Sequence, residues 1–114
     1  MGKAYAINAC PSPVPELIPG TIVLHKHTRH GHIEFFHPEV PFGSVQVAMS
    51  NPCYICESKT EPGDWVFVSE RCTNEYGDVL RVSVRNVDGV NLVTSAYYSG
   101  ATNHGVIRWG RDDG

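Results

Sequence analysis

Apolar and polar residues alternate through the second half of the chain, in the pattern of strands that bury one face. In the run 79–85, apolar side chains at positions 80, 82 and 84 alternate with Arg81, Ser83 and Arg85. Together with this run, three others that are rich in β-branched and aromatic residues occupy 64–69, 90–97 and 105–109. Turn-forming residues separate them, and Asp88 with Gly89 is a strong hairpin signal. The pattern predicts a four-stranded antiparallel β-meander.

The first half of the chain has a less regular pattern. Residues 8–20 contain four prolines, which exclude a helix or a central strand and predict an extended arm. Residues 21–26 suit a short strand. Pro38 and Glu39 suit a helix start, and an imperfect helical pattern continues to Ser50. We therefore expect an α+β protein in which a short N-terminal helical part packs on the meander, with residues 1–20 as an arm and 21–114 as one domain.

Composition narrows the classes of protein to consider. The chain has 114 residues and a formal net charge of −3, which disfavours broad electrostatic binding of nucleic acid but permits a local basic site. No stretch approaches the ~20 apolar residues that span a bilayer, so no membrane association is expected. Four cysteines at uneven spacing, without a secretory signal, indicate reduced thiols and a cytoplasmic protein.

Five of the six histidines lie between positions 25 and 37, together with Lys26 and Arg29. Imidazole both takes and gives a proton near neutral pH, so the cluster suggests acid–base chemistry at a phosphate. A metal site is the alternative, because Cys53 and Cys56 add sulfur ligands. Their separation from the histidines matches no standard zinc-finger spacing, and the CxxC pattern alone is weak evidence.

Cleavage of RNA without a metal needs a base, an acid and cations or hydrogen-bond donors for the charged transition state. His32 and His37 are candidates for the proton transfers, and several arginines lie on the predicted sheet. The run 94–98, Thr-Ser-Ala-Tyr-Tyr, adds hydroxyls for a phosphate and rings that can stack on a base. Taken one at a time, each residue also has an ordinary structural explanation: a helix cap, a solvated strand face or a core aromatic.

The order of the motifs GHIEFFHPEV, NPCYI, VLRVSVRNVDGV, LVTSAYY and GVIRW resembles the phage and mobile-element branch of the barnase–EndoU–colicin–RelE superfamily. The resemblance covers about residues 21–110. It implies a helical part on a four-stranded antiparallel sheet and a small ribonuclease that cleaves RNA, tRNA being one candidate, without metal or other cofactor. It also implies a toxin or effector domain, for which a protein inhibitor or immunity partner is expected.

Carried onto this chain, the resemblance implies specific residues for the site. His32 and His37 would transfer protons, Arg71 or Arg81 would hold the phosphate, and Ser95 with Tyr97 would complete the catalytic group. Additional substrate contacts are expected from His30, Arg85, Tyr98 and Arg108. The sequence departs from the family pattern at Phe36, where a basic residue is common, and in its acidic net charge.

Two other functions remain open from the sequence. A non-catalytic module on the same scaffold would bind a protein partner, consistent with the acidic charge and the Pro-rich arm. A zinc-stabilised domain would use Cys53, Cys56 and two histidines.

Overall fold

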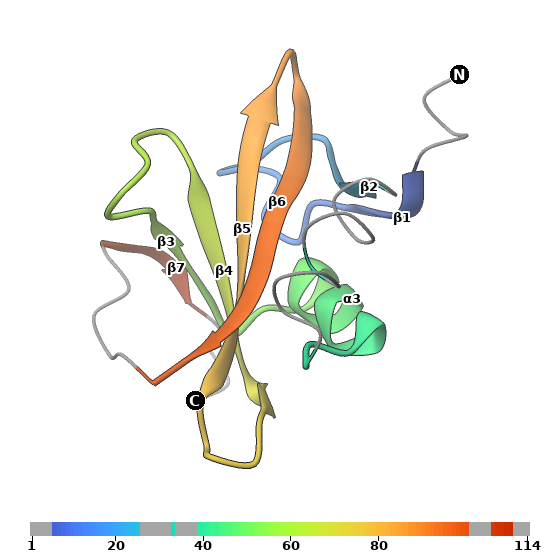
Figure 1. Cartoon of the computed structure of the whole chain (residues 1–114). Helices are drawn as coiled ribbons and strands as arrows, with labels where there is room; N and C mark the ends of the chain where they lie inside the picture. The colour runs from blue at the N-terminus through green and yellow to red at the C-terminus, as the bar shows by residue number, and fades with distance from the viewer. Residues whose placement is uncertain (1–5, 26–32, 34–38, 101–105, 111–114) are drawn as a thin grey trace.

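The computed structural model describes residues 6–25, 33, 39–100 and 106–110. These residues form a curled seven-stranded sheet with one helix against it (Figure 1). The elements are β1 (Ala6–Pro11), β2 (Thr21–His25), α3 (Phe42–Ser50), β3 (Tyr54–Glu57), β4 (Trp65–Thr73), β5 (Val79–Val87), β6 (Val90–Ser99) and β7 (Ile107–Gly110). Across the sheet the strand order is β1-β2-β6-β5-β4-β3-β7.

The expected short helical part on a four-stranded meander is wrong. Strands β4, β5 and β6 do correspond to three of the expected strands and are antiparallel neighbours. The fourth, β7, does not follow β6 in the sheet but pairs antiparallel with β3, at the far end of the strand order. Two further strands, β1 and β2, extend the other end of the sheet, and β2 pairs with β6 in parallel. The sheet is therefore mixed and considerably larger than the sequence pattern predicts.

The Pro-rich segment contributes to this sheet and to its core. Strand β1 is the terminal strand of the order and pairs antiparallel with β2. Proline lacks the N–H that a central strand must donate, so Pro11 is compatible with this edge position. Beyond the strand, Val14 and Ile18 are fully buried within the hydrophobic core. Asn91 of β6 binds the same segment, because its Nδ2 donates to the carbonyl oxygens of Pro19 (2.9 Å) and Thr21 (3.2 Å).

The helix α3 begins after Pro41, so the start expected at Pro38 and Glu39 lies too early. Its buried residues, Val45, Ala48 and Met49, are spaced three and one apart and so form one apolar stripe. The stripe packs against β4 and β5. Asn51 ends the helix, as its position before Pro52 predicts.

The two faces of the sheet are both substantially buried, but by different residues. The helix face carries the main core, including the cross-strand row Ile55, Phe67, Val82 and Ala96. On the opposite face, hereafter the second face, Cys56, Val66 and Val68 are also buried but lie outside the main core cluster. Among the described residues, no helix is long and apolar enough to cross a membrane.

Candidate functional site

A row of side chains crosses the second face through four adjacent strands. Strand register pairs Tyr54 of β3 with Val68 of β4, Val68 with Arg81 of β5, and Arg81 with Tyr97 of β6. Directly opposed residues of an antiparallel pair project to the same face, with Cβ atoms about 4.5–5.5 Å apart. The row continues to Gly110 of β7, which contributes no side chain.

A second row lies two residues along the same strands. It contains Cys56, Val66, Ser83 and Ser95, because Cys56 pairs with Val66, Val66 with Ser83 and Ser83 with Ser95. The hydroxyl of Ser95 therefore shares a face with Arg81 and Tyr97. Three of the residues predicted for the catalytic group, Arg81, Ser95 and Tyr97, are thus brought together by the sheet.

A β-bulge at Thr94 produces this arrangement. On the turn side of the bulge Val84 pairs with Val93, whereas the next pair is Ser83 with Ser95, which leaves Thr94 as the extra residue on β6. Its Oγ1 donates to the carbonyl oxygen of Ser83 (3.3 Å). Without the extra residue, the turn register would place Ala96 rather than Tyr97 opposite Arg81. The bulge therefore selects which side chain lies beside the guanidinium.

Arg81 is the most unusual residue of the site because arginine is rarely buried. Only 7% of its surface is exposed. Its buried Nε–H donates no hydrogen bond among the described residues, although the side chain makes other interactions. Tyr54, Ser95 and Tyr97 around it are half-buried. The site therefore combines a buried cation with hydroxyl groups that solvent still reaches in part.

The charge of Arg81 acts on two neighbouring groups. Burial raises the pKa of the Tyr54 phenol, and the carboxylate of Glu70 raises it further, while Arg81 opposes both effects. Burial likewise raises the pKa of the Cys56 thiol, again opposed by Arg81. Tyr54 and Cys56 therefore remain neutral at physiological pH, and the positive charge of this part of the second face comes from Arg81.

The other predicted arginines are placed elsewhere. Arg71 is exposed, in the stretch of β4 where the register with β5 is interrupted between Ser69 and Thr73. Arg108 on β7 forms an ion pair with Glu57 (3.3 Å). Of the two arginines proposed to hold the phosphate, Arg81 is the one that faces Tyr97.

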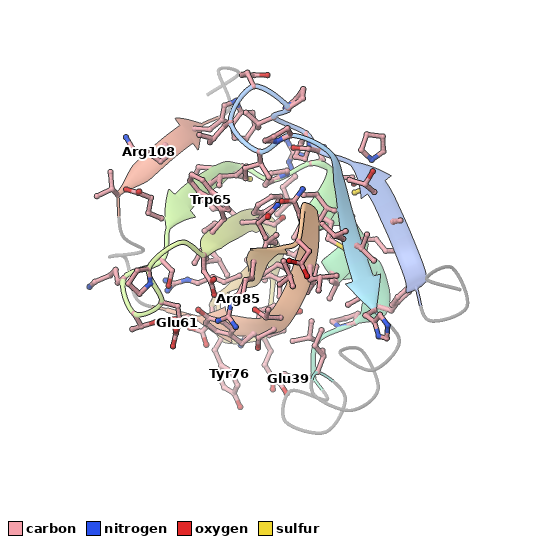
Figure 2. The ribbon with its side chains drawn as sticks, turned by 90° about the horizontal axis from the view of Figure 1, so that it is seen from above. Glu39, Glu61, Trp65, Tyr76, Arg85 and Arg108 are labelled. Atoms are coloured by element: carbon pink, nitrogen blue, oxygen red, sulfur yellow. The ribbon has the colours of Figure 1, made fainter. Side chains whose placement is uncertain are left out.

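Arg85 lies on the same strand as Arg81 but is held by acidic groups. Its Nε and Nη2 donate to the two carboxylate oxygens of Asp64 at 2.9 and 3.0 Å. Glu61 lies 3.9 Å from the same guanidinium, and Figure 2 shows Glu61 and Arg85 close together. The hydrogen bond and charge of Asp64 raise the pKa of Arg85. This bidentate pair ties β5 to the residues that precede β4.

Tyr98 belongs to the opposite side of the sheet. It pairs with Leu80 and packs against the main core, so its ring is separated from Arg81 by the backbone of the sheet. Burial raises the pKa of its phenol. The contact expected between Tyr98 and the substrate therefore does not share a face with the Arg81 row.

The predicted histidines His30, His32 and His37 lie outside the described residues. Nearby positions are described: Ile33 and Val40 are both buried in the main core on the helix face. His25 is described at the end of β2.

The cysteine pair of the zinc alternative occupies a strand. Cys56 lies in β3, and Cys53 is the residue directly before that strand. A thioredoxin-type CxxC instead lies at the start of a helix. Cys53 Sγ accepts a hydrogen bond from the backbone N–H of Glu70 (3.4 Å). Within the described ranges, no three groups from His, Cys, Asp and Glu lie together as metal ligands, and His27, His30 and His32 fall outside those ranges.

Tyr54 is the residue of this site that sequence reasoning missed. The motif Asn-Pro-Cys-Tyr-Ile-Cys drew attention to its cysteines, and the four-residue strand β3 was not predicted. The available signal was a short β-prone run between Pro52 and Ser58, in which Tyr54 and Cys56 alternate with the core residue Ile55.

Comparisons with known proteins add no identification: no family model, curated protein or solved structure matches this chain. The resemblance to the ribonuclease superfamily therefore stays a prediction, and the fold that it implied differs from the mixed seven-stranded sheet of this protein.

Proposed function

We propose that this protein is a metal-independent endoribonuclease whose phosphate-binding site is the second face of the sheet around Arg81. The observation that supports the proposal is the cross-strand pairing of Arg81 with Tyr97, with Ser95 two residues away on the same face. A guanidinium recognises phosphate through its fork of N–H donors, and hydroxyl groups complete such a site.

In the proposed reaction, Arg81 holds the scissile phosphate and Ser95 and Tyr97 contribute hydroxyl hydrogen bonds. The proposed reaction requires one imidazole, predicted to be that of His32 or His37, to reach the second face although Ile33 and Val40 are buried in the core on the helix face. This imidazole removes the proton of the ribose 2′-hydroxyl, whose oxygen then attacks phosphorus. The other imidazole gives a proton to the 5′-oxygen as its bond to phosphorus breaks. The products are a 2′,3′-cyclic phosphate and a 5′-hydroxyl end. Arg81 offsets the extra negative charge of the transition state.

The test is cleavage of total RNA and tRNA in the presence of EDTA. We expect the wild-type protein to leave 5′-hydroxyl ends, and His32→Ala, His37→Ala and Arg81→Lys to cleave at least about 100-fold more slowly. His25→Ala is the matched control, because it removes an imidazole of the same cluster that has no assigned role. Intact RNA with the wild-type protein contradicts the proposal, as does full activity in both His32→Ala and His37→Ala.

We further propose a cytoplasmic toxin or effector role, as the resemblance implies. Support for a reducing compartment comes from the four cysteines, all of which are free thiols. A protein inhibitor would be expected to co-purify with the active chain from its source cells.

A second candidate function is a non-catalytic module that binds a protein. The supporting observation is the pair Val106 and Ile107, which are 60% and 59% exposed. Val106 directly precedes β7, a terminal strand of the sheet, and Ile107 is the first residue of that strand. A terminal strand offers backbone groups to an added strand, and exposed apolar residues favour such contact. An RNA-inactive protein whose partner binding is lost in Ile107→Lys would favour this function.

A further inference from the structure

Tyr54 occupies a defined place relative to the proposed phosphate site. It lies on β3, in the same row as Arg81 on β5, and only Val68 of β4 lies between them. Adjacent strands are spaced about 4.8 Å apart, so the backbones of Tyr54 and Arg81 are about 10 Å apart, with the apolar Val68 between them. Val68 is fully buried and offers no competing polar group.

The other neighbour of Tyr54 in the row is a glycine. Gly110 of β7 pairs with Tyr54, and a Cβ placed on Gly110 would lie 4.0 Å from the Cβ of Tyr54. Gly110 therefore adds no side chain beside Tyr54 in this row. Tyr54 is half-buried, so part of its side chain reaches solvent, and the charges of Glu70 and Arg81 act on its phenol.

The chemistry of the row suits one nucleotide. Aromatic rings stack on nucleobases, and an arginine holds the attached phosphate. Burial, with Glu70, raises the pKa of Tyr54 despite the opposing charge of Arg81, so the phenol stays neutral and does not repel phosphate. A base within a duplex is already stacked and paired, so only an unpaired base is available to such a ring.

We propose that Tyr54 binds an unpaired nucleobase next to the phosphate held by Arg81, so that the substrate is single-stranded RNA. This inference rests on the proposed ribonuclease function. It adds that the substrate is single-stranded and that Tyr54 recognises an unpaired base.

The test is binding of fluorescein-labelled 2′-O-methyl oligonucleotides, which lack the attacking hydroxyl and stay intact. We expect the wild-type protein to bind the single strand more tightly than a hairpin duplex of the same sequence. Tyr54→Leu and Tyr54→Val should raise the dissociation constant for the single strand about 5- to 150-fold, the range of aromatic–base stacking. Tyr54→Phe keeps the ring and should stay within about twofold.

Tyr76→Leu is the matched control, because Tyr76 is 81% exposed in the turn between β4 and β5 and belongs to neither row. Valine suits a strand, so Tyr54→Val keeps the test decisive if the leucine variant does not fold. Circular dichroism verifies folding of each variant.

The outcomes separate this inference from the proposed function. If the wild type cleaves RNA but Tyr54→Leu and Tyr54→Val bind and cleave equally well, the stacking role is overturned and the ribonuclease proposal stands. If the wild type binds the single strand without cleaving natural RNA, the nuclease proposal fails while the two variants still decide the role of Tyr54. Equal affinity for strand and duplex overturns the substrate form, and absence of any RNA binding overturns both proposals.

Discussion

Replacing Asn91 with leucine should loosen the attachment of the Pro-rich segment to the sheet. Asn91 is 1% exposed, and its Nδ2 donates to the carbonyl oxygens of Pro19 and Thr21 at 2.9 and 3.2 Å. Its Oδ1 accepts a hydrogen bond from Nδ2 of Asn86 at 3.0 Å. The substitution therefore removes three hydrogen bonds at one buried position while conserving approximate volume.

The magnitude follows from those three bonds. A typical intramolecular hydrogen bond contributes about 1 kcal/mol net, which gives a loss of about 3 kcal/mol. Pro19 and Thr21 are exposed residues, so water takes over part of the bonding to their carbonyl groups. The leucine also gains some apolar burial. We expect the free energy of unfolding to fall by about 2 kcal/mol for Asn91→Leu.

Urea denaturation followed by circular dichroism measures this change. Asn86→Ala is the control, because it leaves both bonds to the Pro-rich segment. It removes the bond to Asn91 Oδ1 and the bond that Asn86 Oδ1 accepts from the backbone N–H of Gly89 (3.3 Å). Because Asn86 is exposed and water replaces part of both bonds, its cost should be about 1 kcal/mol. Asn91→Asp gives a second signature. A carboxylate facing two carbonyl oxygens is repelled by them, so this variant should lose more stability at pH 7 than at pH 4, where protonation restores one donor. A loss below about 0.5 kcal/mol for Asn91→Leu, or no pH dependence for Asn91→Asp, would refute the reasoning.

Two further predictions concern backbone conformation and thiol ionisation. Gly89 has a φ of +84°, so Gly89→Ala should lower the free energy of unfolding by about 1 kcal/mol in urea denaturation. Gly43 lies in α3 with open space around a new methyl group, so Gly43→Ala should raise that free energy by about 0.5–1 kcal/mol. Equal effects of the two substitutions would contradict this account. Burial raises the folded-state pKa of Cys56, so the folded protein holds the thiol proton more tightly than the unfolded chain does. The contribution of this difference to the free energy of unfolding is fully present below about pH 8.5, the pKa of an unperturbed thiol. It is lost as the pH rises through the higher pKa of the folded state. Cys56→Ala should therefore flatten the decline of unfolding free energy above about pH 8.5, and an unchanged slope would argue against a buried thiol. Cys10 and the two tyrosines with raised pKa values should preserve part of that decline.

The sequence predicted the central hairpin well because its determinants are local. Alternation in 79–85 and 90–97 indicated one buried face for each strand, and the Asp88–Gly89 turn is confirmed, with φ of +52° and +84° and Val87 paired with Val90. A two-residue turn of this kind requires positive φ at both central positions, and Asp and Gly are residues that tolerate it.

The remaining parts of the sheet depend on contacts between distant segments. Pairing of β3 with β7, and of β2 with β6, joins residues that no local pattern relates. Strand β1 was missed because prolines at nearby positions disfavour strands, although a terminal strand tolerates them.

The site shows the same division between local and distant determinants. The turn register alone would have placed Ala96 opposite Arg81, and only the bulge at Thr94 brings Tyr97 there. No feature of the run Thr-Ser-Ala-Tyr-Tyr indicates where the extra residue falls. Tyr54 was missed for a related reason: its strand has only four residues, and that strand is defined by its pairing with β4 and β7, which are distant in the sequence.

The position of β7 has a consequence for how the polypeptide reaches its native state. Its partner β3 is complete at Glu57, yet Ile107–Gly110 must be synthesised before the outer side of β3 is covered. During translation the nascent chain therefore presents an open strand edge while about 50 further residues, from Glu57 to Ile107, are added. In this period, pairing with another chain competes with closure of the sheet.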